Sequence, residues 1–377
     1  MRIAFAEIRR AKVRFSLLTG AVGLLVFLIL FQQSLAGTLL GSFTGGLENQ
    51  TASVVVFGED ARRSVEGSRV TPEQVTAVAE VDGVADAGAI GASTFSAEVA
   101  GGALVDATVF GYELGGPGAP ATIVQGRAPE ADGEAVASAA DAADGFAIGD
   151  VVRIVPADVE IEIVGLAEDV NFNVQPTMFA SYATYEALVR TTNPDARGVL
   201  PSIVGVMPDD GMDPVVVAAA ITDAVEGVDA VDRDTAVASL PGVSSISQSF
   251  AIILGLAFVV VVLLTGFFFL IITVQKTTAL TLLRAVGASS GYLLRNLVAQ
   301  VVLVVGAGTV LAIGLLAVAA AAASTDAFEV RADPTVVAIT SGAILGLALV
   351  ASIGSMRRVL RIDPASATTR TAGGGLA

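Results

Sequence analysis

Four long stretches of the chain hold no charged residue. They cover residues 17–36, 249–274, 297–323 and 335–356, and each has the length of ~20 residues or more that a helix needs to cross a bilayer. Leu, Val, Ile, Phe and Ala occupy every side of a helix drawn through these stretches, so no polar face is left for water. The pattern predicts four transmembrane helices in preference to four buried helices of a large soluble core.

Residues 37–248, between the first two stretches, show a different pattern of short β-rich runs and amphipathic helices. In residues 160–164 polar and apolar side chains alternate, which is typical of a strand with one face in water. Gly, Pro and Asp supply turns between the runs. We therefore expect a mixed α/β domain, whose strands include residues 53–57, 151–155, 160–165 and 202–207. The fold class is that of an α+β membrane protein.

Three helices are expected in this domain, over residues 181–192, 214–226 and a segment that begins at Thr71-Pro72-Glu73 with an N-cap residue, a first-turn proline and an acid. The segment after Thr71 and the helix over 214–226 run into similar phrases, Val81-Asp82-Gly83-Val84 and Val225-Glu226-Gly227-Val228. Two interpretations remain open. The phrases mark two related modules that flank an inserted middle portion, or Gly-Val pairs simply recur in an Ala- and Val-rich chain.

The middle portion contains residues 111–120, which are rich in Gly and Pro and predict a loop. Gly115-Gly116-Pro117-Gly118 is not interpreted as a phosphate-binding loop, because no lysine, no suitably placed Ser or Thr and no following helix accompany it. A plain surface loop is the prediction here.

Composition excludes several classes of chemistry. Hydrophobic residues make up 54% of the 377 residues, charged residues 15%, and the mean hydropathy is +0.75, which fits a protein that is partly dissolved in lipid. The absence of Cys and His excludes thiol and imidazole catalysis and Cys/His zinc sites. Neither Lys12 nor Lys276 follows a glycine, so there is no G-x-x-x-x-G-K-[ST] loop for ATP. We expect no catalytic residue, cofactor or metal in this chain.

The charged residues predict an orientation in the membrane. Three short segments, residues 1–16, 275–296 and 357–377, hold 12 of the 21 basic residues and two of the 37 acids, which places them in the cytoplasm by the positive-inside rule. Residues 37–248 hold 32 acids and eight arginines, a local charge of −24, and belong outside with the loop 324–334. We expect a multi-pass protein of the cell membrane with both termini cytoplasmic.

An alternative for the first stretch is a cleaved signal peptide, because Ser34-Leu35-Ala36 offers small residues for cleavage. The long apolar run and the long basic segment before it favour a retained helix. Cleavage would leave the acidic domain outside in either case.

The acidic groups do not predict a metal or catalytic site. Groups such as Asp209/Asp210/Asp213 and Asp229/Asp232/Asp234 lack the spacing of a calcium-binding loop. A solvated acidic surface is the preferred interpretation, and a cationic partner stays open. The net charge of −16 argues against nucleic acid as a partner.

Two apolar patterns indicate contacts of the membrane part. Residues 275–296 form an elbow in which Ala279, Leu280, Leu283 and Val286 have helical spacing, which suits either the lipid surface or a cytoplasmic protein. In the fourth stretch, Gly342-x-x-x-Gly346 would allow close helix packing within or between subunits, although a Gly- and Ala-rich span also produces this spacing by chance.

A series of phrases recurs in a characteristic order. The chain reads Gln125-Gly126-Arg127-Ala128-Pro129, Gly133-Glu134-Ala135-Val136, Ile148-Gly149-Asp150-Val151-Val152, Ile161-Glu162-Ile163-Val164-Gly165, Leu282-Leu283-Arg284-Ala285-Val286-Gly287-Ala288 and finally Asp363-Pro364-Ala365. In order and spacing these phrases resemble the permease subunits of MacB/FtsX-type ABC transporters, and the resemblance covers nearly the whole chain.

The resemblance implies a MacB-like external domain, an FtsX-like membrane domain and a separate ABC ATPase that binds ATP and Mg. In this family two permeases pair, each docks on an ATPase, and closure of the ATPases moves the external domains. The absence of charged residues from the four stretches agrees with spans that form no ion path. Where relatives have an acid before Leu-Leu-Arg, this chain has Ala279-Leu280, so an acidic contact to the ATPase is not implied.

The residues that the resemblance assigns to ATPase coupling all lie in the elbow. An apolar set would enter a groove of the ATPase, two cations would contact its rim or lipid phosphates, and a glycine would close the elbow. In order along the chain they are Lys276, Leu280, Leu282, Leu283, Arg284, Ala285, Val286, Gly287 and Ala288.

Three functions compete at this point. The first is a permease that couples ATP hydrolysis to work of the external domain, such as export of a peptide, a drug or a lipid-linked cargo. The second is an FtsX-like regulator that activates a cell-wall hydrolase. The third is a membrane-anchored sensor without an ATPase. The size of the domain over 37–248 favours the first, and the elbow argues against the third.

Overall fold

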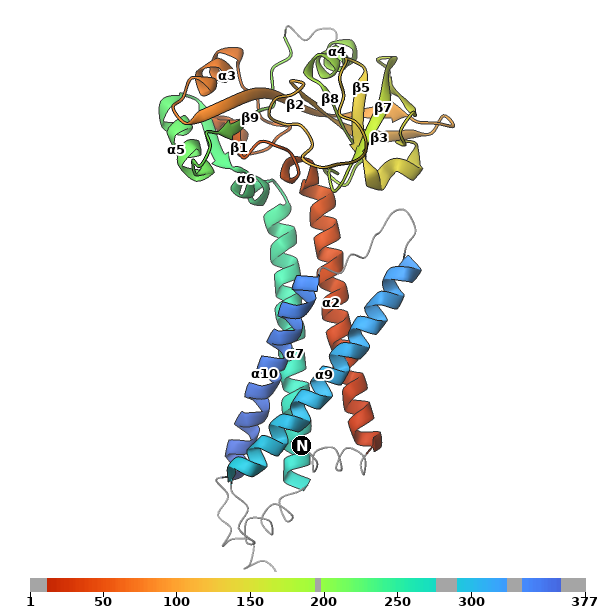
Figure 1. The fold of residues 1–377 in the computed structure, drawn as a ribbon, viewed down its shortest axis with the longest axis vertical. Coiled ribbons are helices and arrows are strands. Elements are labelled where there is room, and N and C mark those ends of the chain that lie inside the picture. Colours follow the sequence, from red (N-terminus) through yellow and green to blue (C-terminus); the bar gives the residue numbers. More distant parts are fainter. Residues whose placement is uncertain (1–11, 194–197, 276–289, 324–333, 361–377) are drawn as a thin grey trace, which may run out of the picture. The chain divides into compact units, whose positions relative to one another are not determined.

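The computed structural model describes residues 12–193, 198–275, 290–323 and 334–360 (Figure 1). The chain divides into two units, one of residues Gly37–Gln248 and the other of Met1–Ala36 with Ser249–Ala377. Helices α2 (Lys12–Glu48) and α7 (Val243–Gln275) contribute residues to both units. The first unit, for which the sequence predicts a location outside the cytoplasm, is called the external unit below, and the second is called the membrane unit.

The membrane unit consists of apolar helices, which are α9 (Ser290–Ala323) and α10 (Pro334–Leu360) together with most of α2 and α7. In the described residues, three runs are long and apolar enough to cross a membrane, namely Phe15–Glu48, Val243–Phe268 and Val298–Ala322. The chain is therefore a multi-pass membrane protein. The apolar run described in α10, Pro334–Val350, is shorter, so a fourth span over 335–356 stays a prediction.

A buried cluster joins the helices of the membrane unit. Val22, Val26 and Ile29 of α2 pack with Val301 and other residues of α7, α9 and α10. Two polar contacts cross this cluster. The Thr340 hydroxyl of α10 donates to Gln33 Oε1 at 2.9 Å, and Gln32 Nε2 donates to the Phe250 carbonyl at 3.5 Å. Polar groups in an apolar surrounding are satisfied by each other in this way.

Two membrane helices, α2 and α9, approach each other closely where glycine faces glycine. A Cβ atom on Gly23 of α2 would lie 3.0 Å from the carbonyl oxygen of Gly308 on α9, and a Cβ on Gly308 would lie 3.1 Å from the backbone nitrogen of Gly23. Gly342 and Gly346 of α10, by contrast, have nothing within 4 Å of such an atom. In the described chain the close packing predicted for Gly342 and Gly346 therefore belongs to Gly23 and Gly308, and packing of α10 between subunits stays a prediction.

One half of the external unit is a split βαβ arrangement. Strand β1 (Val54–Gly58), helix α3 (Pro72–Ala79) and strand β2 (Val84–Glu98) form the first module, and β9 (Ile203–Pro208), α5 (Pro214–Ala224) and β10 (Val228–Asp232) form the second. The strand order is β10-β1-β9-β2 with all neighbours antiparallel. This is the order of a ferredoxin-like βαββαβ fold.

The repeated phrases are the turns that end α3 and α5. Gly83 and Gly227 adopt φ angles of +92° and +78°, a region in which a residue with a Cβ is strained. Both helices then pack on one core, in which Val78, Val217 and Ile221 contact strands β1 and β9. The interpretation of two modules around an inserted portion thus describes the architecture, and the two modules share one sheet.

Helices α3 and α5 begin as their first residues predict. Thr71 accepts from Gln74 N while the Gln74 side chain accepts from Thr71 N, a reciprocal cap. Asp213 caps α5 before Pro214. The helix expected at residues 181–192 is α4 (Tyr182–Thr192), capped by Ser181.

The inserted portion continues the same sheet. Beyond β2 the order is β3-β8-β5-β7-β4, and β6 pairs with β2 and β7. The long strand β2 pairs with β9 over residues 84–90 and with β3 over residues 90–98, so it belongs to both halves (Figure 1). The strands are β3 (Leu104–Tyr112), β4 (Ile123–Gly126), β5 (Glu134–Ser138), β6 (Val151–Val155), β7 (Val159–Ala167) and β8 (Thr177–Ser181).

Short helices complete the unit, namely the 3₁₀ helices η1 (Glu59–Ala61) and η2 (Ala139–Asp144) and the helix α6 (Arg233–Ser239).

The four runs predicted as strands lie in β1, β6, β7 and β9, so those predictions are confirmed. The loop predicted from residue 111 begins later, because Gly111 and Tyr112 pair with Gly91 and Ile90 as the end of β3.

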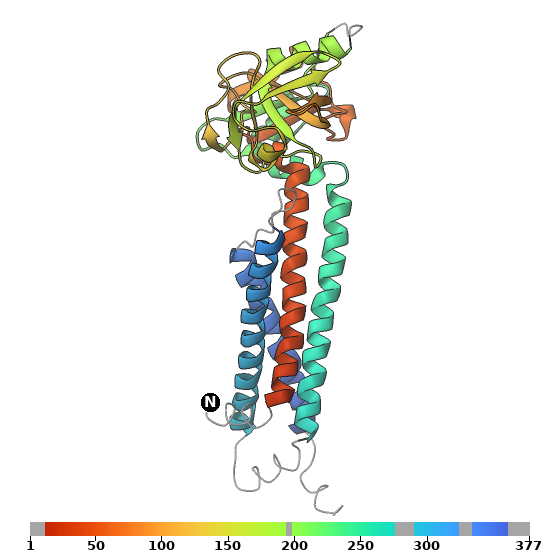
Figure 2. The same cartoon turned by 90° about the vertical axis from the view of Figure 1, so that its right-hand side faces the viewer.

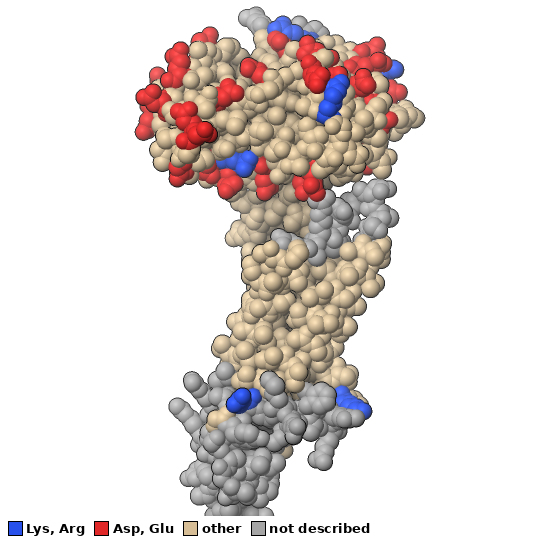
Figure 3. All heavy atoms as spheres, viewed as in Figure 1, with Lys and Arg blue, Asp and Glu red and all other residues tan. Residues whose placement is uncertain are grey.

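The charges separate as the sequence predicts. On the face in Figure 3 the acidic side chains gather over the external unit, while the described membrane helices are uncharged except for basic groups at one end. A surface of this kind repels anions and attracts cations over a distance set by the salt concentration.

We predict that Gly308→Leu destabilises the membrane unit, by about 1–3 kcal/mol as for other overpacked interiors, because the new side chain meets the backbone of α2. Gly346→Leu is the matched control and should leave the stability of the isolated chain unchanged, since open space surrounds Gly346. Thermal unfolding of the full chain in detergent measures both. Equal melting temperatures for the two variants would contradict the assigned helix crossing.

Candidate functional site

The residues predicted to couple to an ATPase lie outside the described part of the chain. The structure describes α7 up to Gln275 and α9 from Ser290. The elbow residues Lys276, Leu280, Leu282, Leu283, Arg284, Ala285, Val286, Gly287 and Ala288 all fall between these two helices. Their role therefore stays a prediction from the sequence.

The structure does describe how α2 and α7 enter the core of the external unit. Leu47 near the end of α2 and Val243 at the start of α7 belong to one buried cluster, together with Phe57 and Phe110 of the sheet. Leu47 is fully buried and Val243 is 6% exposed. Both helices are thus packed into the core of this unit, so a displacement of either helix must disturb its packing.

A loop over residues 169–175, between β7 and β8, is attached to the end of α2. Gly46 N donates to the Asn171 carbonyl at 2.9 Å, Asn173 N to the Phe43 carbonyl at 3.2 Å and Val174 N to the Ser42 carbonyl at 2.9 Å. The Asn49 side chain donates to the Asp169 carbonyl at 2.6 Å. We call residues 169–175 the α2-bound loop.

Two glycines of α2 make this attachment possible. A Cβ on Gly45 would lie 2.3 Å from the Asp169 carbonyl oxygen, and one on Gly46 would lie 3.1 Å from Phe172 Cβ. No side chain larger than hydrogen fits at Gly45 without moving the loop backbone. The sequence contains this Gly-Gly pair, but nothing local distinguishes it from other glycines of α2 such as Gly41, which has nothing within 4 Å.

The α2-bound loop also connects to a half-buried carboxylate. Asn171 Nδ2 donates to Asp141 Oδ2 of η2 at 2.7 Å, and Ser138 Oγ donates to Asn171 Oδ1 at 2.6 Å. The pKa of Asp141 is raised to about 6, mainly by burial and also by the charge of Asp144, and the hydrogen bonds from Asn171 and Ser138 partly oppose this rise. Protonation of Asp141 is therefore accessible at mildly acidic pH.

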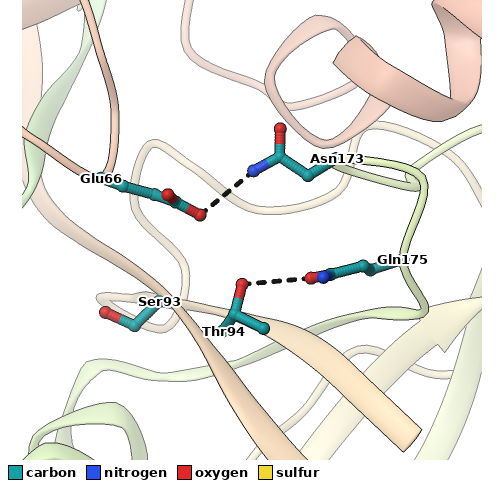
Figure 4. A pocket seen from close by; sticks show the side chains of 5 residues that line it. All are labelled: Glu66, Ser93, Thr94, Asn173 and Gln175. Carbon is teal, nitrogen blue, oxygen red and sulfur yellow. Dashed lines mark hydrogen bonds between the residues drawn. The ribbon is translucent and has the colours of Figure 1, made fainter.

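The loop forms one wall of a polar cleft of about 540 Å³. Its lining is Glu66, from the segment between η1 and α3, Ser93 and Thr94 of β2, and Asn173 and Gln175 of the α2-bound loop (Figure 4). Sequence reasoning missed this cleft, because its five residues come from three separate segments and carry no motif.

The phrases of the external unit that carry the family resemblance lie where β4, β5 and β7 meet. Arg127 and Glu134 make a double hydrogen-bonded ion pair of 2.6 and 2.7 Å, and Glu134 also accepts from Glu130 N. The hydrogen bond from Arg127 lowers the pKa of Glu134 to about 2. Gly165 allows close approach of the Arg127 carbonyl, 2.3 Å from where a Cβ would lie. These residues hold β4, β5 and β7 together, and they form no catalytic arrangement.

In the described chain, no group of three or more acidic side chains is placed to hold a metal ion. The described part of the chain thus shows α2 and α7 packed into the core of the external unit, and a polar cleft.

Comparison with known proteins identifies the membrane part. Residues 251–364 match the family described as "FtsX-like permease C-terminal". The C-terminal part of the chain is an FtsX-like permease domain. Members of this family are permease subunits of ABC transporters, and the family implies a partner ATPase. The match spans the described parts of α7 from Ala251 onward, α9 and α10, and it includes the elbow.

Two solved structures are similar to this chain over about half of its length. The periplasmic region of MacB from Actinobacillus actinomycetemcomitans is 14% identical with a TM-score of 0.37, covering 49% of this chain and 90% of that one. The extracellular domain of the ABC-type transporter YknZ from Gram-positive bacteria is 14% identical with a TM-score of 0.33, covering 48% and 98%. No curated protein matches the chain.

We predict that Gly45→Ala destabilises the external unit by about 1–3 kcal/mol, because the methyl group displaces the backbone of the α2-bound loop. The matched control is Gly41→Ala on the same helix, which should stabilise the protein by about 0.5–1 kcal/mol through helix propensity alone. Thermal unfolding of the full chain and hydrogen exchange at the Gly46 amide report both effects. A neutral Gly45→Ala variant with full protection at Gly46 would contradict the tight attachment.

A second prediction concerns pH. The pKa of Asp141 rises from its ordinary value of 3.8 to about 6 in the folded protein. The folded state therefore holds the proton of Asp141 more tightly than the unfolded state does. The resulting contribution to the free energy of unfolding is complete below the ordinary pKa and is lost as the pH rises through 6. Asp141→Asn keeps an oxygen for Asn171 and removes the charge. The variant should be about 1–2 kcal/mol more stable than the wild type at pH 7.5 and equal to it at pH 3.5, as measured by denaturant unfolding at each pH.

Proposed function

We propose that the chain is the permease subunit of an ABC transporter that passes the work of a separate cytoplasmic ATPase to its external unit. The observation that carries the proposal is the continuity of α2, one helix of 37 residues from Lys12 to Glu48 (Figure 2). At the rise of an α-helix this is about 55 Å, whereas the hydrocarbon core of a bilayer is about 30 Å thick. The helix extends beyond its membrane segment, and its last turns are hydrogen-bonded to the α2-bound loop.

Helix α7 supports the proposal from the other side of the elbow. It is continuous from Val243, which is buried in the core of the external unit, to Gln275, next to the predicted coupling residues. Because the hydrogen-bonded helix is continuous between these two ends, we propose that a displacement at the elbow is passed along α7 to its start. The family match, which includes the elbow, implies the ATPase that supplies this force.

The elbow residues have distinct proposed roles. Leu280, Leu282, Leu283, Val286 and Ala288 insert into a groove of the ATPase, and Lys276 and Arg284 contact its rim or lipid phosphates. Gly287 ends the elbow helix, and Ala285 leaves room for close approach. The ATPase, and no residue of this chain, binds ATP and Mg. Two permeases pair in the cell membrane, with both termini in the cytoplasm and the acidic external unit outside. The work is export of a peptide, a drug or a lipid-linked cargo.

Replacing Leu283 with Glu should abolish co-purification with the ATPase and the stimulation of its ATP hydrolysis, because a carboxylate is costly to bury in an apolar groove. We expect at least a ~100-fold loss of affinity from a penalty of about 3 kcal/mol. Leu104→Glu is the control. It makes the same change on β3, where the side chain is 68% exposed, and should leave both measurements at the wild-type level.

The Leu283→Glu protein should insert into the membrane and, after extraction, should elute from gel filtration as the wild type does. This result shows that the variant is intact. Stimulated hydrolysis retained in an intact Leu283→Glu protein would refute the assigned docking role.

A further inference from the structure

The polar cleft of the external unit has a lining that selects for one kind of ligand. It presents one carboxylate, two carboxamides and two hydroxyls, and neither a basic nor an apolar side chain. An apolar ligand would leave these polar groups without partners, which is costly. An anion would face Glu66 and the local charge of −24 with no cation in the cleft to receive it. Polar ligands that are neutral or positively charged remain.

Several of the lining groups have hydrogen-bonding capacity left for a ligand. In the described chain the carboxylate of Glu66 accepts one hydrogen bond, from Asn173 Nδ2 at 3.1 Å, and makes no ion pair. A carboxylate has about four acceptor positions. Gln175 Oε1 accepts from the hydroxyls of Thr94 and Thr108, both at 3.1 Å, and these bonds orient its amide. Figure 4 shows Glu66 and Asn173 opposite Thr94 and Gln175 across the cleft.

One wall of the cleft is held in a strained conformation. Asn173 and Val174 have φ angles of +53° and +59°, and for a β-branched residue such as Val174 this is a rare conformation. The backbone hydrogen bonds from these residues to Phe43 and Ser42 of α2 maintain it. Strain of this kind is found where a wall is shaped in advance for a ligand.

We propose that this cleft binds an organic cation, the ammonium or guanidinium group of a basic peptide, with Glu66 as its counter-ion and Thr94, Asn173 and Gln175 as hydrogen-bonding partners. The surplus of 24 negative charges on residues 37–248 attracts such a peptide from solution. A volume of about 540 Å³ accommodates a charged side chain with the adjoining peptide backbone. The inference adds a ligand class to the proposed permease and does not depend on coupling to an ATPase.

Isothermal titration of the full chain in nanodiscs of zwitterionic phosphatidylcholine tests the proposal at a fixed salt concentration. The probes are the acetylated and amidated peptides tetralysine and tetraglutamate, together with spermidine and a neutral chitin oligosaccharide. We expect tetralysine to bind and tetraglutamate and the oligosaccharide not to bind. Spermidine binding as tightly as tetralysine would support the cation site and identify a free polyamine as its source, whereas weaker binding identifies a peptide.

The decisive variant is Glu66→Gln, which keeps the size of the side chain and removes its charge. It should weaken tetralysine binding about 10-fold, the effect of losing one charged hydrogen-bonding partner. Glu80→Gln makes the same change of net charge on an exposed residue outside the cleft, and should change affinity less than about twofold. Thr94→Val, which removes one hydroxyl from the lining, should weaken binding about fivefold.

Equal losses in Glu66→Gln and Glu80→Gln would overturn the proposal, because the peptide would then be held by the acidic surface as a whole. Absence of tetralysine binding, or binding of the oligosaccharide in its place, would also overturn it. The Leu283→Glu protein should still bind tetralysine, and the Glu66→Gln protein should still co-purify with the ATPase, so failure of one proposal is distinguishable from failure of the other. Unchanged thermal unfolding shows that each cleft variant is folded.

Discussion

The attachment of residues 169–175 to the end of α2 is the contact on which the external unit depends. At Gly45 the loop backbone approaches the helix so closely that only a hydrogen atom fits between them, and three backbone hydrogen bonds fix the contact. The same loop bears Asn171, which is bonded to Asp141, and Asn173 and Gln175, which line the cleft. These few residues thus connect the position of α2 with the titratable carboxylate of Asp141 and with the shape of the cleft. A close-packed interior of this kind responds to displacement by discrete rearrangement.

The sheet explains why such a connection is stable. Strand β2 pairs with β9 along its first half and with β3 along its second, so the split βαβ half and the inserted half share one continuous backbone. Phe172 of the α2-bound loop meets Phe110 edge to face with ring centroids 5.3 Å apart, and Phe110 stacks on Phe179 with centroids 5.0 Å apart, so the loop is packed into the core of the unit. Aromatic pairs of this geometry add to the stability gained from burial.

Glycine has two separate roles in this protein. At Gly83 and Gly227 it permits a backbone conformation that ends a helix before a strand, and the surrounding residues predict this role. At Gly23, Gly308 and Gly45 it permits two backbones to approach, and the partner in each case is distant along the chain. The pair Gly342 and Gly346 has the spacing of a packing motif, and in the described chain nothing lies within 4 Å of a Cβ at either residue, so packing of this pair between subunits stays a prediction.

The sequence by itself determined the features that depend on neighbouring residues. Uncharged runs determined the apolar helices, alternation determined strands such as β7, and Thr71 and Ser181 determined helix starts, because solvation and capping act over a few residues. The order of several short phrases was enough to indicate the family. Only the tertiary structure decided that Gly23 meets Gly308, that Gly45 meets Asp169 and that Glu66 faces Gln175 across a cleft. These contacts join segments far apart in the chain, and their energy depends on distances between backbones that no local pattern specifies.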